Sequence, residues 1–300
     1  MSLFKESYSL VRTIYSHPYN RRKPFFALYR LLRWQLHKKL SSRRRVYAYW
    51  GTRKVSCYPD SPESMWLVYN YYMDWDEFHF IKRYVRQASV VLDVGANIGV
   101  YTLWISQYLG NEGRLIAFEP DPQNCRRCAE NIEQNSLEMV RLEQIALSNR
   151  GGKLEFSVGK DVENHLMPDD AVTGSSIAVE GTTLDEYCQL QDIARIDFLK
   201  IDVEGAELLV LQGATNALAR SMIGVIQLEL TDALKRYGIE RSDLVELLHK
   251  HDYSLYTYSC VENRLHAVQE DDETPQNVYA IHDIDGVHSR LQAPQYSAAL

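Results

Sequence analysis

Two acidic residues follow apolar strands at the spacing found in nucleoside-binding α/β proteins. Asp93 lies in the run Val90–Val94, whose β-branched residues predict a buried parallel strand, and residues 100–109 predict a helix. The next strand, Arg114–Phe118, leads to Glu119, about twenty residues past the turn, where a carboxylate accepts hydrogen bonds from ribose hydroxyls. Together they predict a nucleoside-cofactor site, whose turn residues are Gly95, Ala96, Asn97 and Gly99.

The turn also indicates which cofactor is bound. A dinucleotide-binding turn reads G-x-G-x-x-G, with a middle glycine that lets a pyrophosphate approach the backbone. Residues 95–99 lack that glycine, and the Asp93 carboxylate would repel a pyrophosphate while attracting an ammonium group. S-adenosylmethionine carries an ammonium, a sulfonium and a ribose diol, so we expect it as the cofactor. The alternatives are a dehydrogenase, which the same features disfavour, and an α/β turn that binds nothing.

A second charged cluster surrounds the ends of two later strands. Lys200 lies inside the apolar run 196–202, and a further strand spans 224–229. The carboxylates at these strand ends are Asp202, Glu204, Glu207 and Glu229. Because ligands of open α/β sheets lie at the carboxyl ends of the strands, we expect these carboxylates to share one rim with Asp93. Taken singly, each has another interpretation, as a helix cap or as a salt-bridge partner of Lys200.

Charge is distributed unevenly along the chain. The net charge is -7, yet residues 1–54 contain 14 Lys and Arg against one Glu, and the other 246 residues contain 19 basic and 39 acidic side chains. A basic amphipathic helix is predicted from Pro24 to about residue 41. Three roles stay open for residues 24–45: packing on the chain's own acidic domain or on a second subunit, contact with a membrane surface or lipid-linked substrate, and nucleic-acid binding.

The cysteine content and the apolar runs of the sequence indicate the cellular compartment of the protein. Five scattered cysteines predict no disulfide framework, and the C-x-x-C at Cys125 and Cys128 predicts core packing on a helix, not a zinc site. No long apolar run predicts a membrane span, and no secretory signal is evident. We therefore expect a cytoplasmic protein, with contact at the inner membrane face left open.

The order of elements predicts one large α/β domain with an appendage. We expect a basic extension over 1–54, one domain over 55–285 and a loose tail over 286–300. Further strands are predicted at 46–58 (as a pair), 140–146, 153–158, 253–258 and 278–282, and helices at 76–86, 122–135 and 242–251. The polar stretch 159–181, which includes His165, Asp169 and Asp170, predicts a long functional loop or disorder. The aromatic stretch 66–75 suits either a sugar or adenine contact or the core.

These motifs resemble the FkbM family of S-adenosylmethionine-dependent methyltransferases. The resemblance rests on the 93–99 turn, on Glu119-Pro120, on the step around Ala146 and above all on the Lys-x-Asp-x-Glu-Gly-x-Glu motif at 200–207. It covers roughly residues 65–285. It implies a seven-stranded, doubly wound Rossmann-like sheet (class I methyltransferase) with an antiparallel last strand. It also implies methyl transfer, mostly to hydroxyls of sugars, polysaccharides or polyketides.

The roles expected from that resemblance follow from the chemistry. A hydroxyl is a weak nucleophile, so a base should stand close to it. Asp202 or Glu204 is the first choice for the base, Glu229 for orienting the acceptor, and Lys200 for holding the carboxylates or acting itself; His165 on the long loop is a further candidate. The carboxylates are also compatible with Mg²⁺, although no residue requires a metal.

Other functions stay open from sequence. A non-catalytic nucleoside-binding module of a membrane-associated glycan-assembly complex is one, and an RNA or protein methyltransferase is another. The second is disfavoured because residues 202–205 read Asp-Val-Glu-Gly where base-modifying enzymes resemble Asn-Pro-Pro-Tyr, and because the acidic excess repels phosphate. The acceptor's identity and a homo-oligomer are not determined by the sequence.

Overall fold

The computed structural model describes residues 11–159, 164–168, 175–268 and 276–294. It divides into two units, Met1–His79 and Phe80–Leu300. This boundary lies 25 residues beyond the 54/55 division expected from charge, because the 45–57 hairpin and the helix after it belong to the first unit. All the candidate site residues lie in the second unit.

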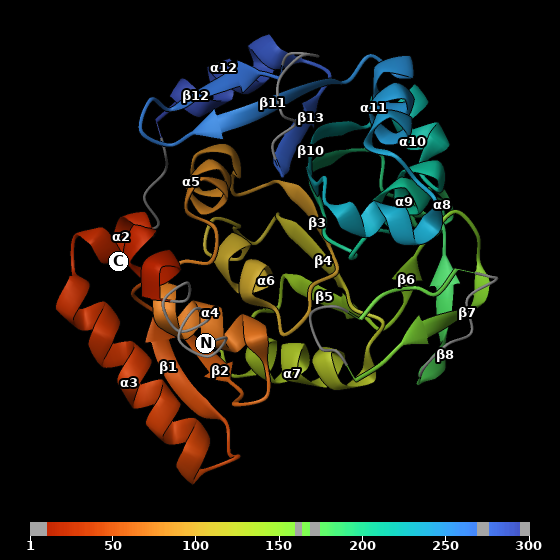
Figure 1. Cartoon of the computed structure of the whole chain (residues 1–300). Coiled ribbons are helices and arrows are strands. Elements are labelled where there is room, and N and C mark those ends of the chain that lie inside the picture. The colour runs from red at the N-terminus through yellow and green to blue at the C-terminus, as the bar shows by residue number, and fades with distance from the viewer. Residues whose placement is uncertain (1–10, 160–163, 169–174, 269–275, 295–300) are drawn as a thin grey trace. The chain divides into compact units, whose positions relative to one another are not determined.

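An eight-stranded sheet organises the second unit (Figure 1). Its strands are β3 (Val90–Val94), β4 (Arg114–Phe118), β5 (Val140–Glu143), β9 (Ile196–Ile201), β10 (Ile223–Glu229), β11 (Ser254–Ser259), β12 (Arg264–Ala267) and β13 (Asn277–Ile281). They lie in the order β12-β11-β13-β10-β9-β3-β4-β5, and β13 pairs antiparallel with β10. Without the edge strand β12, this is the predicted seven-stranded doubly wound sheet with an antiparallel last strand, so the fold prediction is confirmed.

Helices cover both faces of this sheet. They are α6 (Val100–Ile105), α7 (Pro122–Glu133), α8 (Leu184–Leu190), α9 (Glu207–Gln212), α10 (Thr215–Ala219), the 3₁₀ helix η2 (Asp232–Tyr237), α11 (Arg241–Lys250) and α12 (Ile284–Gln292), with the end of α5 (Trp75–Tyr84). Alternate strand residues, such as Leu92, Leu199 and Ile226, pack in one buried cluster with residues of α8 to α11. The next residues along each strand face the opposite layer.

A separate three-stranded sheet was only partly predicted. It contains β6 (Ala146–Leu147), β7 (Gly152–Ser157) and β8 (Ser176–Thr182), in the order β6-β8-β7. Residues 140–146 were expected to form one strand, but the strand ends at Glu143 and Ala146 pairs with Gly181 in the smaller sheet. The expected irregular segment 159–181 also contributes β8, because its residues 176–181 pair with β7. Asp169, Asp170 and Thr173 lie outside the described residues.

The prediction of a loose tail from residue 286 is wrong for its first turns. Residues 284–292 form α12, which buries Val287 and Leu291 on one face. Its Arg290 donates hydrogen bonds to the Tyr84 carbonyl oxygen (2.7 Å) and to Asp197 Oδ1 (2.9 Å). Two buried residues give too little periodicity to recognise a helix from sequence, and the contacts that fix it are distant in the chain.

The first unit contains α2 (Pro18–Arg21), α3 (Pro24–Leu40), the hairpin β1 (Arg45–Tyr49) and β2 (Arg53–Cys57), and α4 (Pro62–Asn70). The predicted basic helix and strand pair are confirmed. Within the aromatic stretch, Tyr69 is fully buried and its hydroxyl accepts a hydrogen bond from Gln35 Nε2 (2.5 Å), so this residue serves the core of the unit.

Candidate active site

The glycine turn after β3 has the backbone conformation that its sequence predicts. Gly95 and Gly99 have φ values of +82° and +87°. A Cβ atom at Gly95 would lie 1.8 Å from the Asp202 carbonyl oxygen, and one at Gly99 would lie 2.7 Å from Cys128 Sγ. Only glycine allows both the left-handed φ and these close approaches, so the turn rests directly on the segment that follows β9.

Glu119 is held by backbone N–H groups on both carboxylate oxygens. Asn97 N–H donates to Oε2 (2.7 Å) and Asp121 N–H donates to Oε1 (2.8 Å). Burial raises the pKa of Glu119 to about 8, although these two bonds favour its charged form. A carboxylate has about four acceptor sites, so two N–H partners leave capacity for ribose hydroxyls. The Glu119 carboxylate is therefore fixed against the glycine turn.

Asp93 and Lys200 form a buried ion pair beneath the turn. Thr102 Oγ1 donates to Asp93 Oδ2 (2.6 Å), while Asp93 Oδ1 accepts no hydrogen bond from the described residues and lies 3.8 Å from Lys200 Nζ. Burial raises the pKa of Asp93, and the Lys200 charge opposes that shift. Lys200 Nζ donates to Asp202 Oδ2 (2.9 Å) and lies 4.4 Å from the centre of the Tyr101 ring. Lys200 thus joins the two acidic positions that the sequence placed on separate strands.

The pairing register extends this contact into a polar row across four central strands. Asp93 pairs with Lys200, Lys200 with Gln227, and Gln227 with Tyr279. All four residues are buried, and Gln227 Oε1 has no hydrogen-bond partner among the described residues. Gln227 was not among the residues predicted from the sequence, although it is the only polar side chain in the run Ile223–Leu228 and can be recognised by that feature.

The carboxylates at the carboxyl ends of β9 and β10 lie close to one another, where the sequence placed an acidic rim. Burial, and next the charges of Asp202, Glu229 and Glu207, raise the pKa of Glu204 to about 8. The described residues include no hydrogen-bond partner for the Glu204 carboxylate, which is partly exposed. Glu229 differs, because its Oε1 accepts a hydrogen bond from Gln276 Nε2 (2.7 Å). Close like charges around an unpaired carboxyl are the arrangement expected of a base that works near neutral pH.

Glu207 has a structural task at the start of α9. Its Oε1 accepts hydrogen bonds from Val203 N–H and Gly205 N–H, both at 3.2 Å. Burial raises the pKa of Glu207 to about 7, and its Oε2 has no partner among the described residues. Glu207 therefore ties down the loop that carries Glu204, whose own φ is +56°.

The 3₁₀ helix η2 supports the same loop and was not predicted. Gly205 packs so closely against η2 that an added Cβ would lie 2.4 Å from the Ala233 carbonyl oxygen. Arg236 Nη1 donates to the Glu204 carbonyl oxygen (2.9 Å). No sequence signal marks these residues, because they follow β10 and reach the loop only through the fold.

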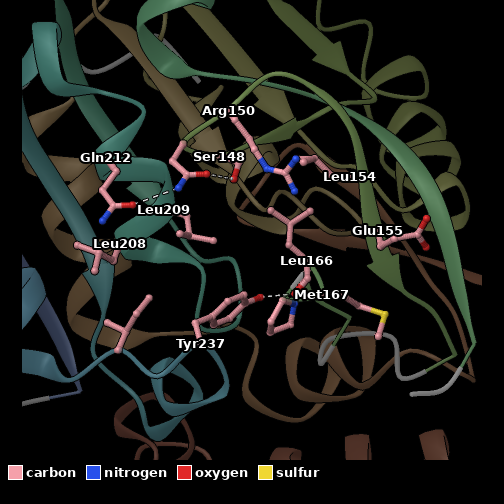
Figure 2. Close-up of a pocket in the computed structure, with 13 residues that line it drawn as sticks. Ser148, Arg150, Leu154, Glu155, Leu166, Met167, Leu208, Leu209, Gln212 and Tyr237 are labelled. Carbon is pink, nitrogen blue, oxygen red and sulfur yellow. Dashed lines mark hydrogen bonds between the residues drawn. The ribbon is translucent and has the colours of Figure 1, made fainter. Parts of the chain in front are cut away.

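A cavity of about 440 Å³ lies between α9, η2 and the smaller sheet. Figure 2 shows Gln212 and Arg150 at one side and Leu166 and Tyr237 at the other. The Tyr237 hydroxyl donates to the Leu166 carbonyl oxygen. Burial raises the pKa of Tyr237, and the charge of Glu207 raises it further. Because Glu207 is close enough to act on Tyr237, the cavity wall adjoins the loop of the acidic rim. The cavity lining includes no residue of the glycine turn.

The remaining predicted residues lie as follows. Pro120 is half-buried between Glu119 and the N-cap Asp121 of α7, and Ala146 is buried in β6. His165 N–H donates to Ser157 Oγ (2.9 Å), which attaches this histidine to the smaller sheet. Cys128 is fully buried beside Ala96 and Ala117, as core packing requires. Within the described part of the chain, no group of three or more His, Cys, Asp or Glu side chains is arranged to hold a metal ion.

Comparison with known proteins shows the family of the chain. The Methyltransferase FkbM domain matches residues 93–255, from the Asp93 turn to β11. The chain belongs to the FkbM methyltransferase family. Both the predicted family and the predicted class of enzyme, an S-adenosylmethionine-dependent methyltransferase, are thereby confirmed at the level of the domain.

Two curated relatives of this FkbM domain are methyltransferases. The 2-O-methyltransferase NoeI of Sinorhizobium fredii is 31% identical over 148 residues, which cover 44% of this chain and 60% of NoeI. The hexuronic acid methyltransferase AglP of Haloferax volcanii is 26% identical over 188 residues, which cover 63% of this chain and 73% of AglP. The match thus spans less than two thirds of NoeI. The crystal structure of methyltransferase FkbM from Methylobacillus flagellatus KT aligns with a TM-score of 0.42 at 16% identity, covering 65% of this chain and 44% of that one.

The residues of the FkbM domain fit S-adenosylmethionine chemically. Asp93 Oδ1 is a buried acceptor that receives no hydrogen bond from the described residues, which suits an ammonium group. The Glu119 carboxylate beside the turn suits a ribose diol. The turn itself presents backbone without side chains at Gly95 and Gly99, where an added Cβ would clash with Asp202 and Cys128.

Proposed function

We propose that the protein is an S-adenosylmethionine-dependent O-methyltransferase that acts on a hydroxyl of a sugar or polysaccharide. The observation that carries this proposal is the Glu204 carboxylate, which has no hydrogen-bond partner in the described part of the chain and a pKa of about 8, in a rim of carboxylates next to the glycine turn. Carboxylates are good acceptors for the several hydroxyls of a sugar. The names of NoeI and AglP, a 2-O-methyltransferase and a hexuronic acid methyltransferase, support the same class of acceptor.

The proposed cofactor residues are those that the sequence singled out. They are Asp93, Gly95, Ala96, Asn97, Gly99, Glu119, Pro120, Ala146 and Asp202. Bound there, S-adenosylmethionine would supply a methyl group on a positively charged sulfur, so the donor needs no further activation. The chain's own residues then have three tasks: to exclude water, to align the acceptor oxygen and to remove its proton.

Proton removal is assigned to Glu204. Its carboxylate accepts the proton of the acceptor hydroxyl as the oxygen–methyl bond forms, and partial exposure lets the proton pass to solvent. Asp202, fixed by Lys200, and Glu229, fixed by Gln276, would accept hydrogen bonds from neighbouring hydroxyls of the acceptor. Lys200 is thus a positioning residue. The assignment requires no Mg²⁺.

The cavity beside α9 offers room for further sugar units. Its lining combines apolar side chains such as Leu166 with the polar ends of Arg150 and Gln212, which is the mixture that a sugar ring needs. We expect Gln212→Ala to raise KM for an oligosaccharide acceptor several-fold while leaving the affinity for S-adenosylmethionine unchanged.

A location at a membrane is part of the proposal. Among the residues that the structure describes, no helix is both long and apolar enough to cross a bilayer. We propose that residues 24–45 contact the inner membrane face from the cytoplasm, because the 54 N-terminal residues carry 14 basic side chains and one acidic one.

The decisive experiment measures methyl transfer to a panel of oligosaccharides, including uronic acids, by mass spectrometry of the products. A product that gains one methyl group on oxygen, and that disappears in Glu204→Gln while calorimetry still shows cofactor binding, is expected. Binding of S-adenosylmethionine with no turnover on any carbohydrate, together with methylation of RNA or protein, would refute the proposal.

A further inference from the structure

Helix α3 has two apolar faces, of which one stays exposed. Its inner face buries Ala27 and Trp34 completely. Arg30 Nη2 on the same helix donates to the Tyr69 carbonyl oxygen (2.9 Å), so the helix is anchored to its unit with a fixed rotation. The exposed face holds Phe25, Leu28, Tyr29, Leu32, Leu36 and Leu40. Packing of α3 within its own unit therefore accounts for the inner face alone.

The spacing of the exposed residues makes them one continuous stripe. Residues three or four apart lie on the same side of a helix, so the stripe runs from Phe25 to Leu40, nearly the whole length of the 17-residue α3. Phe25 is 86% exposed, Leu32 60% and Leu40 76%. Single exposed apolar residues are ordinary, but a row of six large ones marks a surface that binds something.

The basic side chains around the stripe indicate what kind of surface binds to it. Exposed basic residues precede, interrupt and follow it: Arg21, Arg22, Lys23, Arg33, Lys38, Lys39 and Arg43. Residues 11–54 contain no Asp or Glu. Stripe-to-stripe packing of two copies would bring these like charges together, whereas an anionic bilayer attracts them. An apolar stripe flanked by Lys and Arg is the pattern of a helix that lies in the membrane interface.

We propose that α3 docks flat on an anionic phospholipid bilayer, with the Phe25–Leu40 stripe among the upper acyl chains and the basic side chains at the headgroups. Its length, about 25 Å at 1.5 Å per residue, lies along the membrane plane. The proposal deepens the membrane contact proposed above by naming the lipid class and the inserted face. It does not depend on which acceptor is methylated.

Liposome sedimentation of the full chain tests the proposal. The protein should sediment with phosphatidylcholine vesicles that contain about 30% phosphatidylglycerol, and hardly at all with pure phosphatidylcholine, because the anionic headgroups attract the basic side chains. Leu32→Ser with Leu36→Ser should lower binding at least tenfold. Because both residues are exposed, folding should be unaffected, which circular dichroism would check. Arg33→Gln with Lys38→Gln should also weaken binding, and the remaining binding should depend less on salt.

A matched control lies in the second unit. Leu190 and Val261 are 76% and 91% exposed, and their replacement by Ser should leave sedimentation unchanged. Equal binding of the stripe variant and wild type, or no binding of wild type to anionic vesicles, would overturn the proposal. So would a dimer in analytical ultracentrifugation that the stripe variant abolishes, because a second copy would then be the occupant. Methyl transfer to a soluble acceptor should persist in the stripe variant, which separates this proposal from the catalytic one.

Discussion

Glu204→Gln is the substitution that tests the assignment of the base. The change keeps the size of the side chain and removes its ability to accept a proton. General-base catalysis contributes about 10²- to 10⁴-fold, so kcat should fall by at least about 100-fold. Cofactor binding should persist, because Glu204 lies on the rim after β9 and not on the glycine turn.

The pH dependence gives a sharper expectation. With a pKa of about 8, Glu204 is mostly protonated at pH 7 and mostly ionised at pH 9. A base works only when ionised, so kcat should rise with pH, about tenfold from pH 7 to pH 9, and level off above that. This rise through about pH 8 is opposite to the loss of activity expected if a protonated carboxyl were the working form.

The assay is kcat measured with saturating acceptor at half-unit pH steps. Glu207→Gln is the matched control, because Glu207 also titrates in this range, with a pKa of about 7, but its Oε1 accepts backbone N–H bonds that an amide oxygen can retain. The control should keep the alkaline rise, whereas Glu204→Gln should lose it. A Glu204→Gln enzyme with more than half of the wild-type kcat, or with the same pH profile, would refute the assignment.

Three further predictions concern the support of the site. Lys200→Met leaves a fully buried carboxylate without its cation and should lower the free energy of unfolding by about 3–5 kcal/mol in urea titrations; a loss below about 1 kcal/mol would contradict the ion pair's role. Gly95→Ala should lower the free energy of unfolding by about 1–3 kcal/mol more than Gly152→Ala does. Both glycines have a left-handed φ, but only at Gly95 would the added Cβ meet a backbone oxygen. Equal losses of stability in the two variants would contradict this reasoning. Glu119 binds its proton with a pKa of about 8 when folded and near 4.5 when unfolded, so the free energy of unfolding should fall as pH rises between these values. Glu119→Gln should make that decline shallower, and an unchanged slope in urea midpoints at pH 5 to 8 would count against the assigned shift.

The sequence alone predicted most strands of the main sheet, the glycine turn and the acidic motif at 200–207. These are local signals: β-branched runs predict buried strands, and two glycines with a carboxylate at a set spacing predict a nucleoside turn. Strand ends gather at one edge of a parallel sheet whatever the loops do. For that reason the rim of Asp202, Glu204 and Glu229 could be predicted without a structure.

Only the tertiary structure decided how those residues are coupled. The register between strands pairs Lys200 with Asp93 and places Gln227 beside Lys200. The spacing of residues within one segment does not determine this register. The pKa of Glu204 depends on burial and on charges from two strands, so it exists only in the folded chain. The exposure of the apolar residues of α3 is also known only from the fold, because the amphipathic pattern of the sequence does not show which of them are covered. Its fixed rotation buries Trp34 and leaves Leu32 exposed, because a helix can pack only one side against its own unit.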